Sequence, residues 1–471
     1  MRNWTAETVV RVTKGSLIGN PNLEVQGCIL DSRQARGGEM FFALLGERVD
    51  GYDYIEVAWK NGAVLAIADE ARFKKAETKP NVPEGKALLL VKSVFIALQE
   101  LAQNWRAELK AKVVGVTGSN GKTTTKDMIY AVLSKQFRVY RNKENNNNEL
   151  GLPLTILNAP PGTEILILEM GMRGLGEIKS LCEIAKPDIG VITNIGTTHL
   201  ELLLTQERIA QAKWELVEAL PNDGIAIINA EDMFSVQKAE EDSHSICFYG
   251  LEGAFVKPNI KGIQLRPWGE LGTTFDVNYK DQKMSANLPL PGTHNVLDAL
   301  AALAVGTVLG VSLDKGCMGL RELELSKMRL EVRQGVLGSV LINDVYNANP
   351  VSMQASLEVL KERAGGNKTL AILGDMYELG ISAASGHREV GRTLASLGVS
   401  GLITVGNLAA EIAQGAQKAG YCEDRIKVTG SHIEAVEKAL DLLASWGTGT
   451  WVLIKGSRGM RMEEITAKLE R

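Results

Sequence analysis

The chain has 471 residues, of which 45% are hydrophobic and 23% charged, with a formal net charge of -4. This composition is typical of a globular protein, and a prior of roughly one domain per 150 residues suggests about three domains. The slightly acidic balance excludes a general attraction to nucleic acid or to anionic membranes, so any phosphate must bind at a local site. We therefore expect small-molecule substrates.

The cysteines and the apolar runs indicate the compartment. The five cysteines are scattered without a Cys-x-x-Cys pair, which argues against a disulfide framework and a zinc site. The N-terminus has no continuous apolar segment of the secretory kind, and no run approaches the ~18 apolar residues that a membrane span needs. The sequence predicts a cytoplasmic monomer with no membrane span and no nucleic-acid partner.

The pattern of apolar and polar residues along the chain changes twice. Residues 1–110 mix short strand-like runs with glycine-rich turns, and residues 94–109 have the apolar spacing of a helix that leads into the next segment. From 111 to 326, apolar strands alternate with helical patterns, which is typical of βαβ units around a parallel sheet. The alternation starts again from 327 to 471. We therefore predict three α/β domains with these boundaries.

Short apolar runs give the strands of the second and third domains. The strands predicted for the second domain are residues 113–116, 165–168, 189–193 and 225–228. Those predicted for the third domain lie within residues 339–346, 369–375, 401–406 and 451–457. The runs of the third domain end in Gly, Asp, Asn or Ser, and ligand loops follow such strand ends in open α/β sheets.

The segment VVGVTGSNGKTTTKDM, residues 113–128, places a glycine turn between a strand and a helix. Its glycines permit a tight backbone whose N–H groups can surround a phosphate, and the helix N-terminus adds partial positive charge. Lys122 would neutralise phosphate charge, and Thr123 would offer a hydroxyl to Mg²⁺. The spacing departs from the general G-x-x-x-x-G-K-[ST] pattern because Val116 replaces the first glycine. A glycine-rich turn with a surface lysine is the simpler alternative.

Two further strand ends carry groups that can bind a metal. Glu169 ends the apolar run ILILE, on the same edge of the sheet as the glycine turn, where a Mg²⁺ ion could bridge phosphate oxygens and this carboxylate. The next strand leads to His199 in an equivalent loop. A capping or salt-bridge role is the alternative for Glu169, and a structural role is the alternative for His199.

The helical pattern of residues 206–220 contains one conflict. Ile209, Leu216, Val217 and Leu220 form an apolar stripe, and Lys213 falls within it. A buried, unpaired ammonium group is costly. Lys213 must therefore snorkel to the surface, pair with an anion or be chemically altered, and the residues alone favour snorkelling.

The third domain has three polar strand ends. The segment LINDVYNANPVSM contains Asp344, Tyr346, Asn347 and Asn349, a loop suited to small polar ligands, although Asn-Pro clusters also form ordinary turns. The other two strand ends contribute Asp375, Lys455, Ser457 and Arg458. We predict that these loops form a second binding surface facing a cleft, so that two substrates meet at one nucleotide.

Over nearly the whole chain, these motifs resemble those of the ATP-dependent Mur ligase family. The family's phosphate loop, T-G-[ST]-N-G-K-T-[ST], matches TGSNGKTT, so the unusual spacing is itself a family trait. The other segments that are similar to family segments are DSRQARGGEMFFALLGERVDGYDYIEVAWKNGA, NNNNELGLPLTIL, LEMGMRGLGEI, VITNIGTTHLE, IAQAKWEL, LPLPGTHNVLDALAALAVG, NDVYNANPVSM and LGDMYELG. Asp298 stands where the family commonly has asparagine.

The resemblance also implies roles for individual residues. Nucleotide binding is implied for Thr117, Gly118, Ser119, Asn120, Gly121, Lys122, Thr123, Thr124, Asn295 and Asp344. Substrate binding is implied for Ser32 and Arg33 at the uridine nucleotide, and for Asn147, Asn148, Tyr346, Asn347 and Asn349. Mg²⁺ binding is implied for Thr123, Glu169, His199 and Lys213, the last as a carbamylated lysine. Catalytic roles are implied for Lys122, Lys213, His199 and Arg329.

The implied architecture is a central P-loop ATPase domain with a parallel sheet. An N-terminal α/β domain that binds the UDP-sugar-peptide and a Rossmann-like C-terminal domain that binds the incoming dipeptide flank it. The implied activity is carboxylate–amine ligation with ATP and Mg²⁺, joining D-alanyl-D-alanine to a UDP-N-acetylmuramoyl tripeptide through an acyl phosphate, as a step of peptidoglycan precursor synthesis.

Two kinds of alternative remain open. Another Mur ligase step or a folylpolyglutamate synthetase would share the fold. The DSR region argues against the folate enzyme, and the Asn-rich loop of residues 343–353 argues against the other steps. A nucleotide-dependent switch is the alternative of a different class, but the sequence has no Asn-Lys-x-Asp guanine motif.

Overall fold

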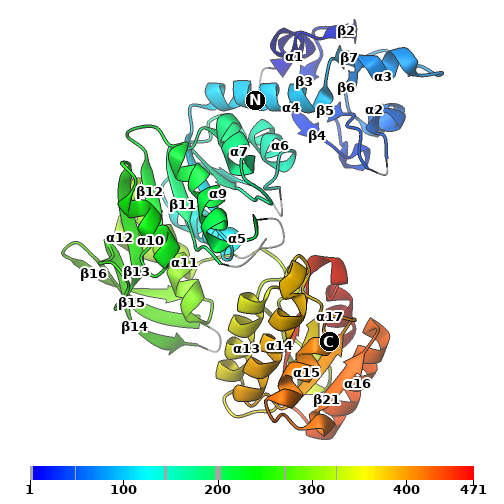
Figure 1. Cartoon of the computed structure of the whole chain (residues 1–471). Coiled ribbons are helices and arrows are strands. Elements are labelled where there is room, and N and C mark those ends of the chain that lie inside the picture. Colours follow the sequence, from blue (N-terminus) through cyan, green and yellow to red (C-terminus); the bar gives the residue numbers. More distant parts are fainter. Residues whose placement is uncertain (1–3, 48, 143–145, 197–202, 270–271, 325) are drawn as a thin grey trace.

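The computed structural model describes residues 4–47, 49–142, 146–196, 203–269, 272–324 and 326–471. Its strands form three large sheets that follow one another along the chain, and Figure 1 shows them as separate α/β units from the blue end to the red end. The predicted class of three α/β domains is confirmed. Each large sheet lies within one of the three predicted ranges, while the boundaries at 110 and 326 stay a prediction.

The N-terminal sheet has the order β2-β7-β6-β5-β4, with β4 to β7 parallel and β2 antiparallel to β7. All five residues of β7 are buried, as expected for a parallel strand covered on both faces. The strands of this sheet are β2 (Ser16–Gly19), β4 (Gly27–Ile29), β5 (Glu39–Phe42), β6 (Leu65–Asp69) and β7 (Ala87–Val91), while β1 (Trp4–Thr5) and β3 (Glu24–Val25) pair antiparallel in a separate two-stranded sheet. The helices of this part are α1 (Ala6–Thr13), α2 (Ile55–Asn61) and α3 (Glu70–Lys75).

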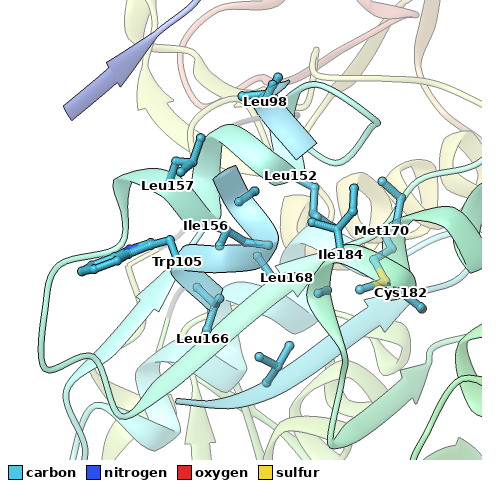
Figure 2. Close-up of a cluster of buried hydrophobic side chains, with 14 of the residues drawn as sticks. Leu98, Trp105, Leu152, Ile156, Leu157, Leu166, Leu168, Met170, Cys182 and Ile184 are labelled. Carbon is cyan, nitrogen blue, oxygen red and sulfur yellow. Dashed lines mark hydrogen bonds between the residues drawn. The ribbon is translucent and has the colours of Figure 1, made fainter. Parts of the chain in front are cut away.

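Helix α4 (Val94–Leu109) covers the range predicted from the sequence. It begins after Ser93, whose hydroxyl caps the first turn, and it packs against α1 on one side and against α6 (Gly151–Asn158) and α7 (Glu177–Ala185) on the other. Figure 2 draws Leu98 and Trp105 of α4 in one apolar cluster with Ile156 of α6. A continuous hydrophobic core therefore joins the N-terminal and central domains.

The central sheet has the order β16-β15-β14-β13-β12-β11-β8-β10-β9, and the four predicted strands are all present. Because β8 lies between β10 and β11 and is parallel to both, the loops that follow these three strands meet at one edge of the sheet. The strands are β8 (Lys112–Thr117), β9 (Val139–Arg141), β10 (Ile165–Glu169), β11 (Ile189–Ile192), β12 (Ile225–Asn229), β13 (Ser245–Leu251), β14 (Ile260–Trp268), β15 (Gly272–Tyr279) and β16 (Gln282–Leu288).

The sequence prediction missed the last strands of this sheet. β14, β15 and β16 pair antiparallel, and a two-residue turn at Lys280 and Asp281 joins the last two. Their signal is the alternation of buried and exposed residues rather than a continuous apolar run. The remaining helices of the central domain are α5 (Lys122–Leu133), α9 (Gln206–Glu218), α10 (Met233–Glu240), α11 (Thr293–Val308) and α12 (Leu313–Arg321).

The C-terminal sheet has the order β17-β18-β22-β19-β20-β21, with β17 antiparallel at one edge and the other strands parallel. Since β18, β22 and β19 are neighbours, the three polar strand ends lie side by side. The strands are β17 (Glu331–Gln334), β18 (Val340–Asn343), β19 (Thr369–Gly374), β20 (Gly401–Val405), β21 (Ile426–Thr429) and β22 (Trp451–Lys455). The helices are α13 (Pro350–Ala364), α14 (Ala383–Ser396), α15 (Ala410–Lys418), α16 (His432–Trp446) and α17 (Glu463–Leu469). None of the described helices has both the length and the apolar character that crossing a membrane requires.

The shared core around α4 can be tested with two substitutions on the same helix. Leu98→Ala removes a fully buried side chain, and we expect it to lower the free energy of unfolding by about 2–5 kcal/mol. Ile96→Ala, at a side chain that is 52% exposed, is the control and should have little effect. Urea unfolding followed by tryptophan fluorescence measures both, and equal effects would contradict a core at α4.

Candidate active site

The glycine turn predicted at residues 118–121 connects β8 to the start of α5. Gly118 has a φ of 151°, and a Cβ atom there would lie 1.8 Å from the hydroxyl oxygen of Thr193. Gly121 has a φ of 80° and precedes the first residue of α5. Glycine is therefore required at both positions. The first N–H groups of a helix have no partner within it, so this helix start is suited to an anion.

The loop after β11 holds the glycine turn in place through Asn194. Its backbone oxygen accepts from Ser119 N at 2.9 Å, and its side-chain oxygen accepts from Asn120 N at 3.0 Å. The hydroxyl of Thr193 donates to Asn120 O at 2.5 Å. Asn194 was not predicted as a site residue, although its place directly after a buried strand was a usable signal.

Lys122 lies over the turn that it follows. Its Nζ donates to Gly118 O at 2.7 Å and to Ser119 O at 3.3 Å. Burial lowers the pKa of Lys122, the Glu169 carboxylate opposes this effect, and the nearby Arg329 cation adds to it. The structure thus places the Lys122 side chain at the glycine turn, while its role toward a phosphate stays a prediction.

The Glu169 carboxylate ends β10 and is 1% exposed. Its Oε2 accepts from the Thr123 hydroxyl at 2.9 Å, and its Oε1 accepts from the Asn147 amide at 2.9 Å. The Lys126 ammonium lies 3.4 Å from Oε2. Lys126 was not predicted as part of the site, although it follows Thr123 by three residues and so shares its face of α5.

The charges around Glu169 favour its ionised form. Burial alone would raise the pKa of this carboxyl, but the cations Lys126, Lys122 and Arg329 and the Asn147 amide hold it below its usual value. A carboxylate beside the hydroxyl of Thr123 provides the oxygen ligands that Mg²⁺ prefers. The donor set present at this strand end therefore fits a magnesium ion.

Lys213 on α9 is 2% exposed. The side chain stays inside the domain, so the interpretation that it snorkels to the surface is wrong: α9 is covered on the face that carries Lys213. Burial lowers the pKa of Lys213 well below its usual value, and the Lys122 cation adds to this while Asp232 opposes it. His199, the other predicted metal ligand, lies outside the described residues.

Helix α11 carries Asn295 and Asp298, which both line the cavity described below. Asn295 is buried and donates to Pro291 O at 2.6 Å. Asp298 lies behind the glycine turn, where it accepts from the Thr125 hydroxyl at 2.9 Å. Burial raises the pKa of Asp298 to about 8, against the effects of the Thr125 hydrogen bond and of Arg329.

Hydrogen bonds connect the loops that follow β18, β19 and β22 of the C-terminal sheet. Asp344 Oδ2 accepts from Lys455 Nζ at 2.5 Å and from the Ser356 hydroxyl at 2.7 Å, and Lys455 also donates to Asn347 O at 3.1 Å. Burial alone would raise the pKa of Asp344, but Lys455 brings it below its usual value. Ser457 accepts from Tyr377 N at 2.8 Å, which joins the loops after β22 and β19.

Two contacts join the C-terminal domain to the glycine turn and to the first turn of α5. Asn349 Nδ2 donates to Asn120 Oδ1 at 2.6 Å. Arg329 Nη2 donates to the Thr123 hydroxyl at 2.8 Å, and the guanidinium lies 4.0 Å from the centre of the Tyr346 ring. Among the described residues, the buried Nε of Arg329 has no hydrogen-bond partner. The guanidinium therefore keeps one N–H donor that no described residue uses.

One cavity of about 2050 Å³ brings most of the predicted residues together. The predicted residues that line it are Ser119, Asn120, Gly121, Lys122, Thr123, Thr124, Asn147, Asn148, Glu169, Asn295, Arg329, Asp344, Tyr346, Asn347 and Asn349. Phe95 and Gln99 of α4 also line it and were not predicted. The cavity thus reaches from the N-terminal domain to the C-terminal sheet.

Some of the predicted residues do not line this cavity. Thr117 is buried beneath the turn, where its hydroxyl donates to Met170 O at 2.9 Å, and Gly118 and Lys213 are also absent from the lining. Ser32 and Arg33 lie in the N-terminal domain, away from the lining residues. The Arg33 side chain is 85% exposed and pairs with Asp31 at 2.7 Å.

Comparisons with known proteins agree with this arrangement. Residues 24–106 match the model described as "Mur ligase family, catalytic domain", residues 116–306 match "Mur ligase middle domain", and residues 328–458 match "Mur ligase, glutamate ligase domain". The chain belongs to the Mur ligase family.

Among curated relatives, the UDP-N-acetylmuramoyl-tripeptide–D-alanyl-D-alanine ligase of Bacillus subtilis (strain 168) is 37% identical, covering 99% of this chain and 98% of the relative. The ligase of the same name from Escherichia coli (strain K12) is 30% identical, covering 98% and 99%. A crystal structure of MurF from Acinetobacter baumannii superposes with a TM-score of 0.86 at 31% identity, covering 99% of this chain and 98% of that chain. MurF ligase from Thermotoga maritima in complex with ADP gives a TM-score of 0.78 at 31% identity, covering 95% and 97%.

The need for glycine at the turn predicts a loss of nucleotide affinity on substitution. A Cβ on Gly121 would lie 2.5 Å from Asp298 Oδ1, so we expect Gly121→Ala to weaken ATP binding by about tenfold or more, or about 1.4 kcal/mol. Gly253→Ala is the matched control, because Gly253 has a similar φ of 92° but no atom near a Cβ. Calorimetric titration with ATP measures both variants, and unchanged affinity in Gly121→Ala would contradict the assignment of the loop.

Proposed function

We propose that the protein is an ATP-dependent ligase that joins D-alanyl-D-alanine to UDP-N-acetylmuramoyl tripeptide. The products are UDP-N-acetylmuramoyl pentapeptide, ADP and phosphate, in a step of peptidoglycan precursor synthesis. The observation that most directly supports this activity is the cavity that the glycine turn, the Glu169 carboxylate and the Asn-rich loop after β18 all line. Relatives that bear the name of this activity match the chain over nearly its full length. The proposed setting is the cytoplasm, where the protein acts as a monomer.

The proposed reaction has two steps. A carboxylate oxygen of the tripeptide attacks the γ-phosphorus of ATP, which forms an acyl phosphate and breaks the bond to ADP. The amine of D-alanyl-D-alanine then attacks the acyl carbon, and the tetrahedral species expels phosphate, which carries away a proton of the amine. In the first step two anions must approach each other, so their repulsion is the main obstacle. Lys122 and Arg329 would offset it, since both side chains line the cavity beside the turn.

Thr123 and Glu169 are the described residues whose oxygens would hold Mg²⁺, and His199 is proposed with them from the family resemblance. Bound Mg²⁺ supplies positive charge to the phosphate oxygens. The fit rests on a buried carboxylate that stays ionised beside a hydroxyl.

Lys213 is proposed to carry a carbamate that holds a second Mg²⁺. Carbamylation needs a neutral amine, and burial together with the Lys122 cation favours that form. Reaction with CO₂ forms a nitrogen–carbon bond, releases one proton and turns the amine into an anionic oxygen ligand. The cost of burying the Lys213 ammonium group would then disappear, because the side chain would carry a carbamate anion paired with a metal ion.

The dipeptide and the sugar-peptide part of the nucleotide substrate are proposed to occupy the rest of the cavity, and the uridine end is proposed to extend beyond its lining residues. Ser32 and Arg33 are assigned to the uridine nucleotide, which would extend from the N-terminal domain. The side-chain oxygen of Asn148 accepts from Gly151 N at 2.9 Å at the start of α6, so its amide N–H groups are the ones that can reach the sugar-peptide. Asn147 is assigned to the same substrate. Tyr346, Asn347 and Asn349 are assigned to the incoming dipeptide, and their loop lies directly over the phosphate-binding turn.

A substrate panel tests the proposed activity. With ATP, Mg²⁺, UDP-N-acetylmuramoyl tripeptide and D-alanyl-D-alanine, we expect UDP-N-acetylmuramoyl pentapeptide with one ADP and one phosphate for each product. Chromatography with mass spectrometry measures the pentapeptide, and a coupled assay measures ADP. Glutamate or a diamino acid in place of the dipeptide is the control. ADP release that does not depend on the dipeptide would refute the assignment.

The carbamate is tested by its dependence on CO₂. Depleting CO₂ should reduce ligation by the unaltered protein, and added bicarbonate should restore it, because the metal ligand would be lost and re-formed. Lys213→Ala should lose at least about 100-fold in kcat, as when a metal and its charge are removed from an active site, while ATP binding persists. Addition of a short-chain carboxylate should partly restore this variant. Activity of Lys213→Ala equal to that of the unaltered protein would exclude the carbamate.

A further inference from the structure

The residue after Lys126 on α5 contacts a segment nearly 200 residues further along the chain. Asp127 is 1% exposed, and its Oδ2 accepts both the backbone N–H of Ser326 at 2.9 Å and the Ser326 hydroxyl at 2.6 Å. Its Oδ1 accepts from Arg141 Nη1 at 2.9 Å. A buried carboxylate that accepts two hydrogen bonds from one residue fixes the position of that residue strongly. None of the proposed binding or chemical steps uses Asp127.

Ser326 lies at the start of the connection between the central and C-terminal domains. The connection is short, because β17 begins at Glu331. Met328 and Leu330 have φ values of 66° and 47°, a region that costs energy for residues other than glycine. Such a conformation persists only where its surroundings hold it. The residue between these two is Arg329.

Hydrogen bonds also fix the end of the connection that lies next to β17. Met328 O accepts from Tyr346 N at 3.2 Å, and Asp344 Oδ1 accepts from Leu330 N at 3.3 Å. These bonds tie the connection to the loop after β18. Arg329 thus lies between an anchor on α5 at one end and an anchor on the C-terminal sheet at the other.

Helix α5 touches this segment at two points that are one helical turn apart. Thr123 accepts from Arg329, and Asp127 accepts from Ser326. The two contacts share one face of the helix, because residues four apart lie above one another.

We propose that Asp127 is a positioning residue of the ligation reaction, which holds Ser326 so that Arg329 is directed at the phosphate-binding turn. Asp127 does not touch the nucleotide; it acts through the backbone of residues 326–329. The proposal rests on the proposed function, because Arg329 is assigned there to offsetting the charge of the transferred phosphate. The nucleotide itself is held mainly by the turn and α11, so loss of the anchor affects kcat more than ATP affinity.

The first test compares three variants in the full-length protein. Asp127→Asn and Ser326→Ala each weaken the anchor, and we expect kcat to fall by about tenfold to 100-fold for the first and less for the second, as when a reacting group is misplaced by about 1 Å. The ATP dissociation constant should change by less than about threefold, since its contacts are retained. Lys135→Met is the matched control, because Lys135 lies just after α5 and pairs with Glu322, whose side chain is 60% exposed, between α12 and the connection. Its kcat should equal that of the unaltered protein.

A double-mutant cycle separates positioning from a general structural role. If Asp127 acts through Arg329, Asp127→Asn or Ser326→Ala should cost little further in an Arg329→Ala background, so that the two effects are not additive. Additive effects would overturn the proposal, and so would a kcat for Asp127→Asn and Ser326→Ala that matches the Lys135→Met control. If Asp127→Asn does not fold, as judged by its thermal unfolding midpoint, the cycle with Ser326→Ala decides.

Failure of the proposed function gives a different result. In that case the unaltered protein forms no pentapeptide, and the substrate panel shows this before any variant is made. If the unaltered protein forms the pentapeptide and the effects of the substitutions on kcat are additive, the positioning role of Asp127 is refuted while the proposed function stands.

Discussion

The hydroxyl of Thr123 is the point on which the site depends. It donates to Glu169 at the end of β10 and accepts from Arg329 in the connection to the C-terminal domain. One side chain on the first turn of α5 thus links the phosphate-binding turn, the proposed metal ligand and the neighbouring domain. A hydroxyl can do this because it donates one hydrogen bond and accepts others. Serine could supply the same bonds, whereas alanine would disconnect Glu169 from Arg329.

The second constraint is the excess of positive charge around that hydroxyl. Lys122, Lys126 and Arg329 all act on Glu169, and without compensation so many cations in a buried region would be unfavourable. A triphosphate and a substrate carboxylate would provide the missing negative charge. Burying Lys122, Lys126 and Arg329 together lowers the stability of the fold. Such a cost is common at functional sites, and here it is consistent with a site that binds anions. By the same argument, the carbamate proposed at Lys213 would suit the region better than an ammonium group.

The sequence predicted those parts of the site that local pattern determines. Glu169 ends a buried strand, Asp344 and the glycine turn each follow one, and strand ends can be recognised from a few neighbouring residues. The bonds between Asp127 and Ser326 and between Asn349 and Asn120 join residues 199 and 229 positions apart, and no local pattern encodes such pairs. Burial of Lys213 also depended on what covers α9. The antiparallel strands β14 to β16 were missed because their alternating pattern is weaker than a continuous apolar run.

The interface between the N-terminal and central domains differs in chemistry from the interface between the central and C-terminal domains. This difference indicates which pair of domains can separate more easily. Helix α4 shares one hydrophobic cluster with the N-terminal and central domains. The apolar clusters of the C-terminal domain, in the part of the chain that the structure describes, are drawn from residues 328–469 alone. Its hydrogen bonds with the central domain include those of Arg329 with Thr123, of Asn349 with Asn120 and of Arg363 with Gly272 O. Small polar interfaces separate at lower cost than apolar ones, which would expose hydrophobic surface to water. Substrate entry is therefore easiest to accommodate at the interface between the central and C-terminal domains, where the connection that carries Arg329 would have to re-form its bonds each time the cavity closes.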